Sequence, residues 1–161
     1  MISKVILPVI ISIMIIGCSF QNVEIEPESI NEGKEIVSKD EEVKMDSIKL
    51  IVNEYELEVE LEENSTTLEL IDKLKNGDIV INASEYGGFE KVGSLGFSLI
   101  RNDEQITTKA GDIVLYQGNQ ISLFYNSNAW SYTKIGRVKN ITQDELKNIL
   151  GDGDVVLTFK L

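Results

Sequence analysis

Cys18 is the only cysteine of the chain, and the residues before it favour its modification by lipid. Lys4 supplies a positive start, and residues 5–16 form an apolar run. This run is shorter than the ~20 residues that span a membrane, which is typical of a signal peptide. The motif Ile15-Ile16-Gly17-Cys18 matches a lipobox, with a small residue at the cleavage point. The sequence therefore predicts that residues 1–17 are removed and that the Cys18 thiol becomes a diacylglycerol thioether.

A lipid on Cys18 would anchor the mature chain in the bilayer, because each buried methylene contributes about 0.8 kcal/mol. An uncleaved N-terminal anchor with an incidental cysteine is the alternative. In both cases we expect the body of the protein on the extracytoplasmic side of the cell membrane.

The rest of the chain offers few groups for catalysis. It contains no histidine, which excludes histidine-based triads, histidine metal sites and histidine proton shuttles. Any catalysis would have to come from carboxylates, lysine, arginine, tyrosine or a positioned hydrogen-bond donor. Arg101 could form an ion pair with Asp103 or Glu104. The sequence assigns no catalytic residue, no cofactor and no metal site.

Two aromatic residues near the end of the chain are candidates for binding. Trp130 and Tyr132 could form the floor of an apolar pocket for a peptide or small ligand, or they could belong to the core. Glu90 could present its charge at a pocket mouth, with a surface ion pair to Lys91 as the alternative. Tyr116 is expected to pack across paired strands.

The charge of the chain limits its partners. It has 27 acidic and 15 basic residues and a formal net charge of −12. Such a chain has no basic surface to replace counterions on phosphates, so nucleic acid is not an expected partner. Residues 18–47 hold many of the acidic groups and few apolar ones, which predicts a disordered tether. Residues 48–161 are expected to form one domain.

The pattern of residues 48–161 predicts a mainly β domain. Apolar and polar residues alternate over 48–52 and 55–62, which is typical of a hairpin with one buried face. Thr142-Gln143-Asp144-Glu145 reads as the capping box of a short helix, and another helix is expected after Thr66. Gly118-Asn119 predicts a hairpin turn. The glycine-rich stretch from Ser84 to Gly96 predicts an irregular loop.

Several motifs in this domain occur in an order seen in one known group of proteins. They are Tyr86-Gly87-Gly88-Phe89-Glu90-Lys91, Gly111 to Gln120, Trp130-Ser131-Tyr132-Thr133, Gly136-Arg137 and Gly151 to Val155. Together they resemble the bacterial cyclophilin-like proteins over roughly residues 48–161. The resemblance implies a small closed β-barrel of about eight strands capped by two short helices.

The catalytic groove of the true cyclophilins resembles this chain at three points. Arg101 follows a strand that contains Phe97, Gln120 opens an apolar strand, and Trp130 precedes Gly136-Arg137. The groove histidine of the cyclophilins has no counterpart. From these features together we expect a binding module for a peptide segment or small ligand. The likeness to the cyclophilin groove implies the alternative, prolyl isomerisation of exported proteins, in which Arg101 would donate to a twisted X-Pro peptide bond. A purely structural surface lipoprotein is the third possibility. The predicted binding residues are Arg101, Gln120, Trp130, Tyr132, Tyr86 and Glu90.

Overall fold

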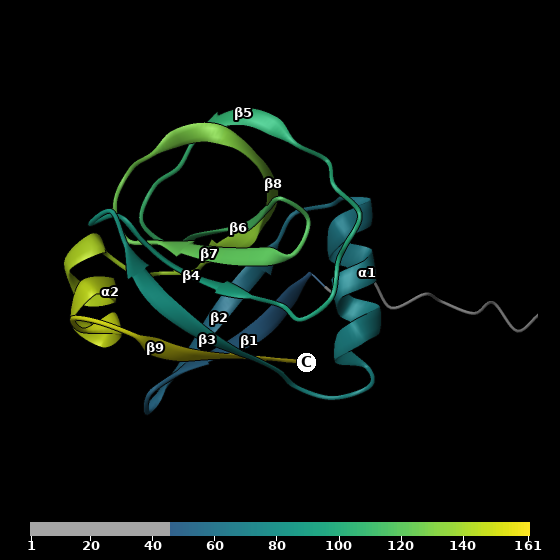
Figure 1. Cartoon of the computed structure of the whole chain (residues 1–161). Helices are drawn as coiled ribbons and strands as arrows, with labels where there is room; N and C mark the ends of the chain where they lie inside the picture. Colours follow the sequence, from purple (N-terminus) through teal and green to yellow (C-terminus); the bar gives the residue numbers. More distant parts are fainter. Residues whose placement is uncertain (1–45) are drawn as a thin grey trace, which may run out of the picture. The chain divides into compact units, whose positions relative to one another are not determined.

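The computed structural model describes residues 46–161, which form a β-barrel with two helices (Figure 1). This confirms the mainly β, barrel-type fold that the sequence predicts. The elements are β1 (Ser47–Val52), β2 (Tyr55–Leu61), α1 (Ser65–Leu74), β3 (Ile79–Tyr86), β4 (Glu90–Ser94), β5 (Glu104–Thr107), β6 (Asp112–Tyr116), β7 (Gln120–Phe124), β8 (Ala129–Val138), α2 (Gln143–Leu150) and β9 (Val155–Lys160).

Eight of these strands close into a ring of antiparallel pairs. The order is β2-β1-β9-β3-β4-β7-β6-β8, and β8 returns to β2 through the pair Val59 and Val138. Closure leaves none of the eight strands with a free edge, which is the usual way in which an antiparallel barrel protects its backbone groups. β5 lies outside the ring and pairs only with β8 among the described strands.

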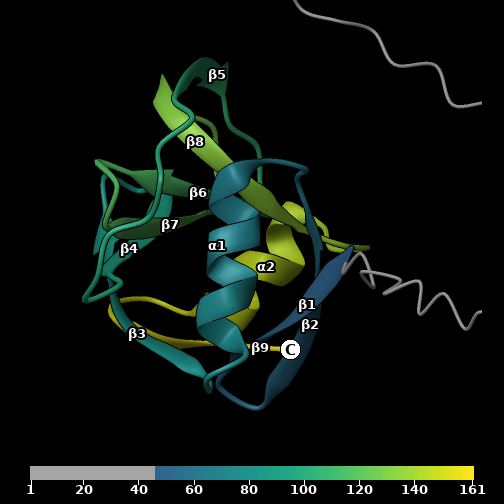
Figure 2. The same ribbon diagram turned by 90° about the vertical axis from the view of Figure 1, so that its right-hand side faces the viewer.

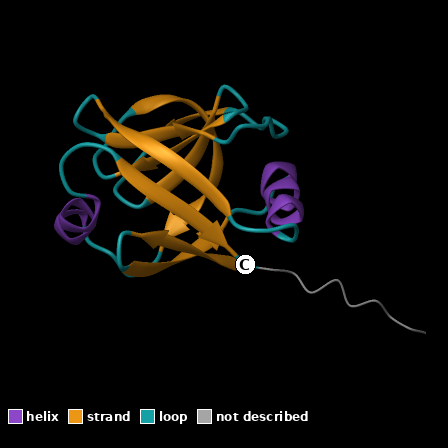
Figure 3. Ribbon diagram, turned by 60° about the horizontal axis from the view of Figure 1, so that its bottom comes forward, coloured by secondary structure: helices purple, strands orange, loops and turns teal. Residues whose placement is uncertain are grey.

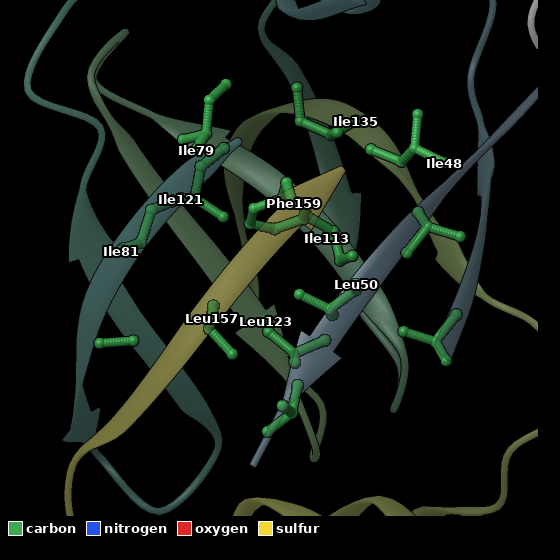
Figure 4. Packing of buried hydrophobic residues seen from close by; sticks show 14 of the residues in the cluster. Ile48, Leu50, Ile79, Ile81, Ile113, Ile121, Leu123, Ile135, Leu157 and Phe159 are labelled. Atoms are coloured by element: carbon green, nitrogen blue, oxygen red, sulfur yellow. The ribbon is translucent and has the colours of Figure 1, made fainter. Parts of the chain in front are cut away.

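The barrel interior is filled by aliphatic side chains that alternate along the strands (Figure 4). Leu50, Ile81, Leu123 and Leu157 are completely shielded from solvent, as is expected for residues on the inward face of a pleated strand. Burial of such side chains is the main stabilising contribution, at roughly 25 cal/mol per Å² of apolar surface.

The two helices lie on opposite sides of the strands (Figures 2 and 3). Both contribute to the same core, α1 with Leu70 and Leu74 and α2 with Leu146 and Leu150. The predicted capping box of α2 is present, because Thr142 and Glu145 exchange hydrogen bonds.

The prediction of an irregular loop from Ser84 to Gly96 is wrong, because the chain forms the end of β3 and all of β4 there. Gly87 and Gly88 adopt positive φ angles of 62° and 75° and make a tight turn between the strands. Gly93 lies within β4, where an added Cβ would stand 2.5 Å from the carbonyl oxygen of Asn82. The absence of a side chain at Gly93 therefore permits the close approach of β3 and β4, and this glycine does not mark a loop.

β8 is the longest of the described strands and bends away from the barrel. It pairs with β5 at its beginning, with β6 in its middle and with β2 at its end. A register shift opposite Ile113 and Val114 introduces a β-bulge, which bends a strand. The beginning of β8, with β5, consequently arches over β6 and β7 (Figure 1).

The predicted signal peptide, the lipidation of Cys18 and nearly all of the tether fall on residues 1–45, outside the described residues. Within the described part of the chain, neither helix has the length and apolar character that crossing a bilayer requires.

Candidate functional site

An open hollow lies on the outer face of the barrel wall, between that wall and the beginning of β8. Its volume is about 430 Å³, within the range of small-ligand pockets. Aromatic side chains make up most of its lining, so we call it the aromatic hollow. It is lined by Tyr86, Phe89, Glu90, Val92, Tyr116, Gln120, Asn128, Trp130 and Tyr132.

Strand register explains why side chains from distant segments meet here. Glu90 in β4 stands opposite Phe124 in β7, and Tyr116 in β6 stands opposite Gln120. Because side chains alternate between the two faces of a strand, these residues point away from the core side occupied by Leu123. The outer face of this part of the wall therefore gathers polar and aromatic groups.

β8 supplies the opposite wall of the aromatic hollow. Trp130 and Tyr132 are two residues apart and share one face of the strand. Tyr132 is only 4% exposed, and its hydroxyl accepts a hydrogen bond of 2.8 Å from the Asn128 side chain. Burial raises the pKa of Tyr132, the bond from Asn128 opposes this, and the charge of Glu90 adds to the increase. Trp130 is 56% exposed, so it stands at the rim.

The rings hold one another in place. Phe89 stacks on Phe124 with centroids 6.1 Å apart, and Tyr132 meets Phe124 edge to face at 5.5 Å. Tyr116 contacts Tyr132 in the same way at 5.9 Å. Such packing gives the hollow a preformed apolar lining.

Glu90 is the acidic side chain of the aromatic hollow, and it is 7% exposed. Its Oε2 atom has no hydrogen-bond partner, and neither has the buried Oγ of Ser122 on the neighbouring strand. Burial raises the pKa of Glu90, the Ser122 hydroxyl opposes that shift without reaching hydrogen-bond geometry, and the charge of Glu85 adds to it. An unsatisfied buried carboxylate oxygen destabilises the fold.

A second hollow of about 440 Å³ lies near the end of α2, beside Glu85, Tyr125 and Gly151. Lys91 lies next to it, and its ammonium group is fully satisfied. It donates to the carbonyl oxygens of Gly151 and Gly153 at 3.0 and 2.6 Å, and it pairs with Glu85 at 2.8 Å. These bonds tie the loop after α2 to the β3–β4 hairpin, which gives the cluster a structural role.

Glu85 is the anionic partner in this cluster. Burial raises the pKa of its carboxyl, but hydrogen bonds from Lys91 and Tyr125 outweigh that effect and lower it. The bond from the Tyr125 hydroxyl to Glu85 also raises the pKa of Tyr125, in addition to the larger effect of burial.

Arg101 does not line the aromatic hollow. It lies in the segment between β4 and β5, where the strand expected around Phe97 does not form. Its guanidinium donates to Asp103, with Nε 2.9 Å from Oδ2. A Cβ added at Gly118 would stand 3.2 Å from Arg101 Cδ, so the residue lies beside the β6–β7 turn. The pairing with Asp103 is the alternative that the sequence left open.

Five of the six predicted binding residues, all except Arg101, therefore line the same hollow. Sequence reasoning missed Phe89, Val92 and Asn128 and assigned Tyr116 to packing alone. The hairpin turn predicted at Gly118-Asn119 pairs Tyr116 with Gln120, and this pairing could have placed Tyr116 in the aromatic hollow.

Chemically, the aromatic hollow holds no nucleophile activated by a base. Its groups can bind apolar surface, accept hydrogen bonds and attract positive charge.

Comparison with known proteins agrees with this architecture. Residues 50–160 match the model of a family described as the cyclophilin-like family. The fold is similar to the solution structure of a hypothetical protein from Archaeoglobus fulgidus, with a TM-score of 0.51 and 21% sequence identity. That similarity covers 70% of this chain and 92% of the archaeal chain. No curated protein matches the sequence.

Proposed function

The chain belongs to the cyclophilin-like family, and we propose that its barrel is a binding module that takes a peptide segment or small ligand in the aromatic hollow. One observation carries this proposal: five aromatic side chains from separate segments line a single open hollow. Tyr86 and Trp130 are 60% and 56% exposed at its rim. Exposed aromatic groups around a preformed pocket are typical of ligand sites, where they supply contact area at low cost in conformational entropy.

The isomerase alternative depends on Arg101 beside Gln120 in a common groove. Gln120 lines the aromatic hollow, whereas Arg101 is paired with Asp103 outside it. We therefore propose binding as the function and do not propose isomerisation.

Binding at the aromatic hollow can be tested on the purified full chain by NMR. The probes are capped amino-acid amides that differ only in their side chains: norleucine, phenylalanine, lysine and glutamate. We expect at least one probe to shift the backbone amide resonances of Tyr116, Gln120 and Trp130. Trp130→Ala should weaken that binding about tenfold, because the indole supplies a large contact area and tryptophan is enriched among the residues that dominate binding energy.

Tyr55→Ala is the matched control, since Tyr55 is 53% exposed in β2 and does not line the aromatic hollow. It should bind the probes as the wild type does. Resonance shifts that map elsewhere on the barrel, or unchanged binding by Trp130→Ala, would refute the assignment.

We also propose that the module is held at the extracytoplasmic face of the cell membrane by lipid on Cys18. The lipobox motif supports this proposal. When the full chain is expressed in a bacterial host with radioactive palmitate, label should appear in the wild type and be absent from Cys18→Ser. An unlabelled wild-type chain that still begins at Met1 would contradict the proposal.

A further inference from the structure

Two neighbouring charged residues of β4, Glu90 and Lys91, are both buried but differ in how they are compensated. Lys91 is 1% exposed and has three acceptors within 3.0 Å. Glu90 is 7% exposed and forms no ion pair among the described residues, and its Oε2 atom has no hydrogen-bond partner. Because adjacent strand residues point to opposite faces, Lys91 cannot compensate Glu90. The negative charge therefore remains uncompensated on the side of the aromatic hollow.

The described cations of the domain lie outside the lining of the aromatic hollow, which contains neither lysine nor arginine. The cation–π contacts of residues 46–161 place Lys73 over Phe97, and Lys91 and Lys147 over Tyr125. None of these rings belongs to the lining, so the electron-rich rings around Glu90 receive no positive charge from this part of the chain.

We propose that the aromatic hollow is specific for an organic cation, a protonated alkylamine or alkylguanidinium, whose charged head meets Glu90; this inference rests on the proposed binding function. Glu90 lines the aromatic hollow with a carboxylate that accepts hydrogen bonds, and such a head carries several N–H donors. The apolar stem of the ligand packs on Tyr116 and Trp130. A carboxylate attracts a cation by its charge, and the faces of the surrounding aromatic rings attract it by their quadrupole.

Capped lysine and capped norleucine test the charge requirement without any variant, because their four-carbon stems match and only lysine carries an ammonium group. Trp130 is the only tryptophan of the chain, so its fluorescence reports on the rim. On the purified full chain we expect lysine amide to bind at least about tenfold more tightly than norleucine amide.

Glu90→Gln should bring this ratio close to one, because it retains the size of the side chain and removes its charge. Glu56→Gln is the control, since Glu56 is an exposed glutamate of β2 that pairs with Lys49 outside the aromatic hollow. It should leave the ratio unchanged. The source of the cation is distinguished by n-butylammonium: equal binding indicates a free amine, and much weaker binding indicates a side chain within a peptide.

The outcomes separate this inference from the proposed function. Equal affinity for lysine and norleucine amides, or tighter binding of glutamate amide, would overturn the cation specificity and leave the aromatic hollow as a binding site. Absence of binding by every probe would overturn both.

Discussion

Lys91→Met tests whether the buried ammonium group organises one end of the barrel. Lys91 is among the largest fully buried side chains of the domain. Methionine has a similar length and remains compatible with an apolar site, so the change mainly removes the charge and its donors. The carbonyl oxygens of Gly151 and Gly153 and the carboxylate of Glu85 would each lose a hydrogen bond.

The magnitude follows from these three contacts. A hydrogen bond to a charged group contributes about 1.5–3 kcal/mol. If all three acceptors were left without a partner, the loss of stability would exceed about 4 kcal/mol. Glu85 is 34% exposed and the Gly151–Gly153 loop lies at the surface, so the acceptors regain water after the substitution. We therefore expect a loss of about 2–3 kcal/mol in the free energy of unfolding, equivalent to roughly 10 °C in Tm for a domain of this size.

Urea denaturation followed by circular dichroism measures this loss. Lys49→Met is the matched control, because Lys49 forms a 2.8 Å ion pair with Glu56 and both side chains are more than half exposed. Its effect should be a small fraction of the effect at Lys91, since exposed ion pairs contribute little. Equal stability changes in the two variants would refute the reasoning that burial makes the Lys91 contacts important.

Two further predictions concern the same hairpin. The lowered pKa of Glu85 means that its carboxylate stabilises the fold above its ordinary pKa, and this contribution is lost as the pH falls through the folded-state value. The difference in unfolding free energy between wild type and Glu85→Gln should therefore shrink between pH 7 and about pH 3, and a difference that grows on acidification would contradict this sign. Gly93→Ala should cost about 2–3 kcal/mol because its Cβ would stand 2.5 Å from the backbone oxygen of Asn82. Gly88→Ala, which has open space but a φ of +75°, should cost only about 1 kcal/mol, and thermal unfolding that ranks the two the other way would refute the steric argument.

Local patterns in the sequence were sufficient to predict much of the barrel. Alternation over residues 48–52 and 55–62 predicted β1 and β2, because a strand with one buried face must repeat every two residues. The Thr142 capping box predicted α2, since a side chain that satisfies the first helical N–H groups acts within a few residues. The family motifs were also recognisable, because their order along the chain can be read from the sequence without knowing which residues are in contact.

The glycine-rich β4 could not be predicted in this way. Its strand identity depends on pairing with β3 on one side and β7 on the other, and Gly93 is needed only because another strand passes close to it. A single sequence shows the absence of a side chain but not the neighbour that requires that absence.

The composition of the aromatic hollow was likewise decided by tertiary structure. Glu90, Tyr116 and Trp130 come from segments that meet only because β4, β7 and β6 are adjacent and β8 bends across them. The sequence alone also left Arg101 and Glu90 each with two open roles. The fold pairs Arg101 with Asp103 and buries Glu90 without a partner, because burial and charge compensation depend on distances in space and not on spacing along the chain.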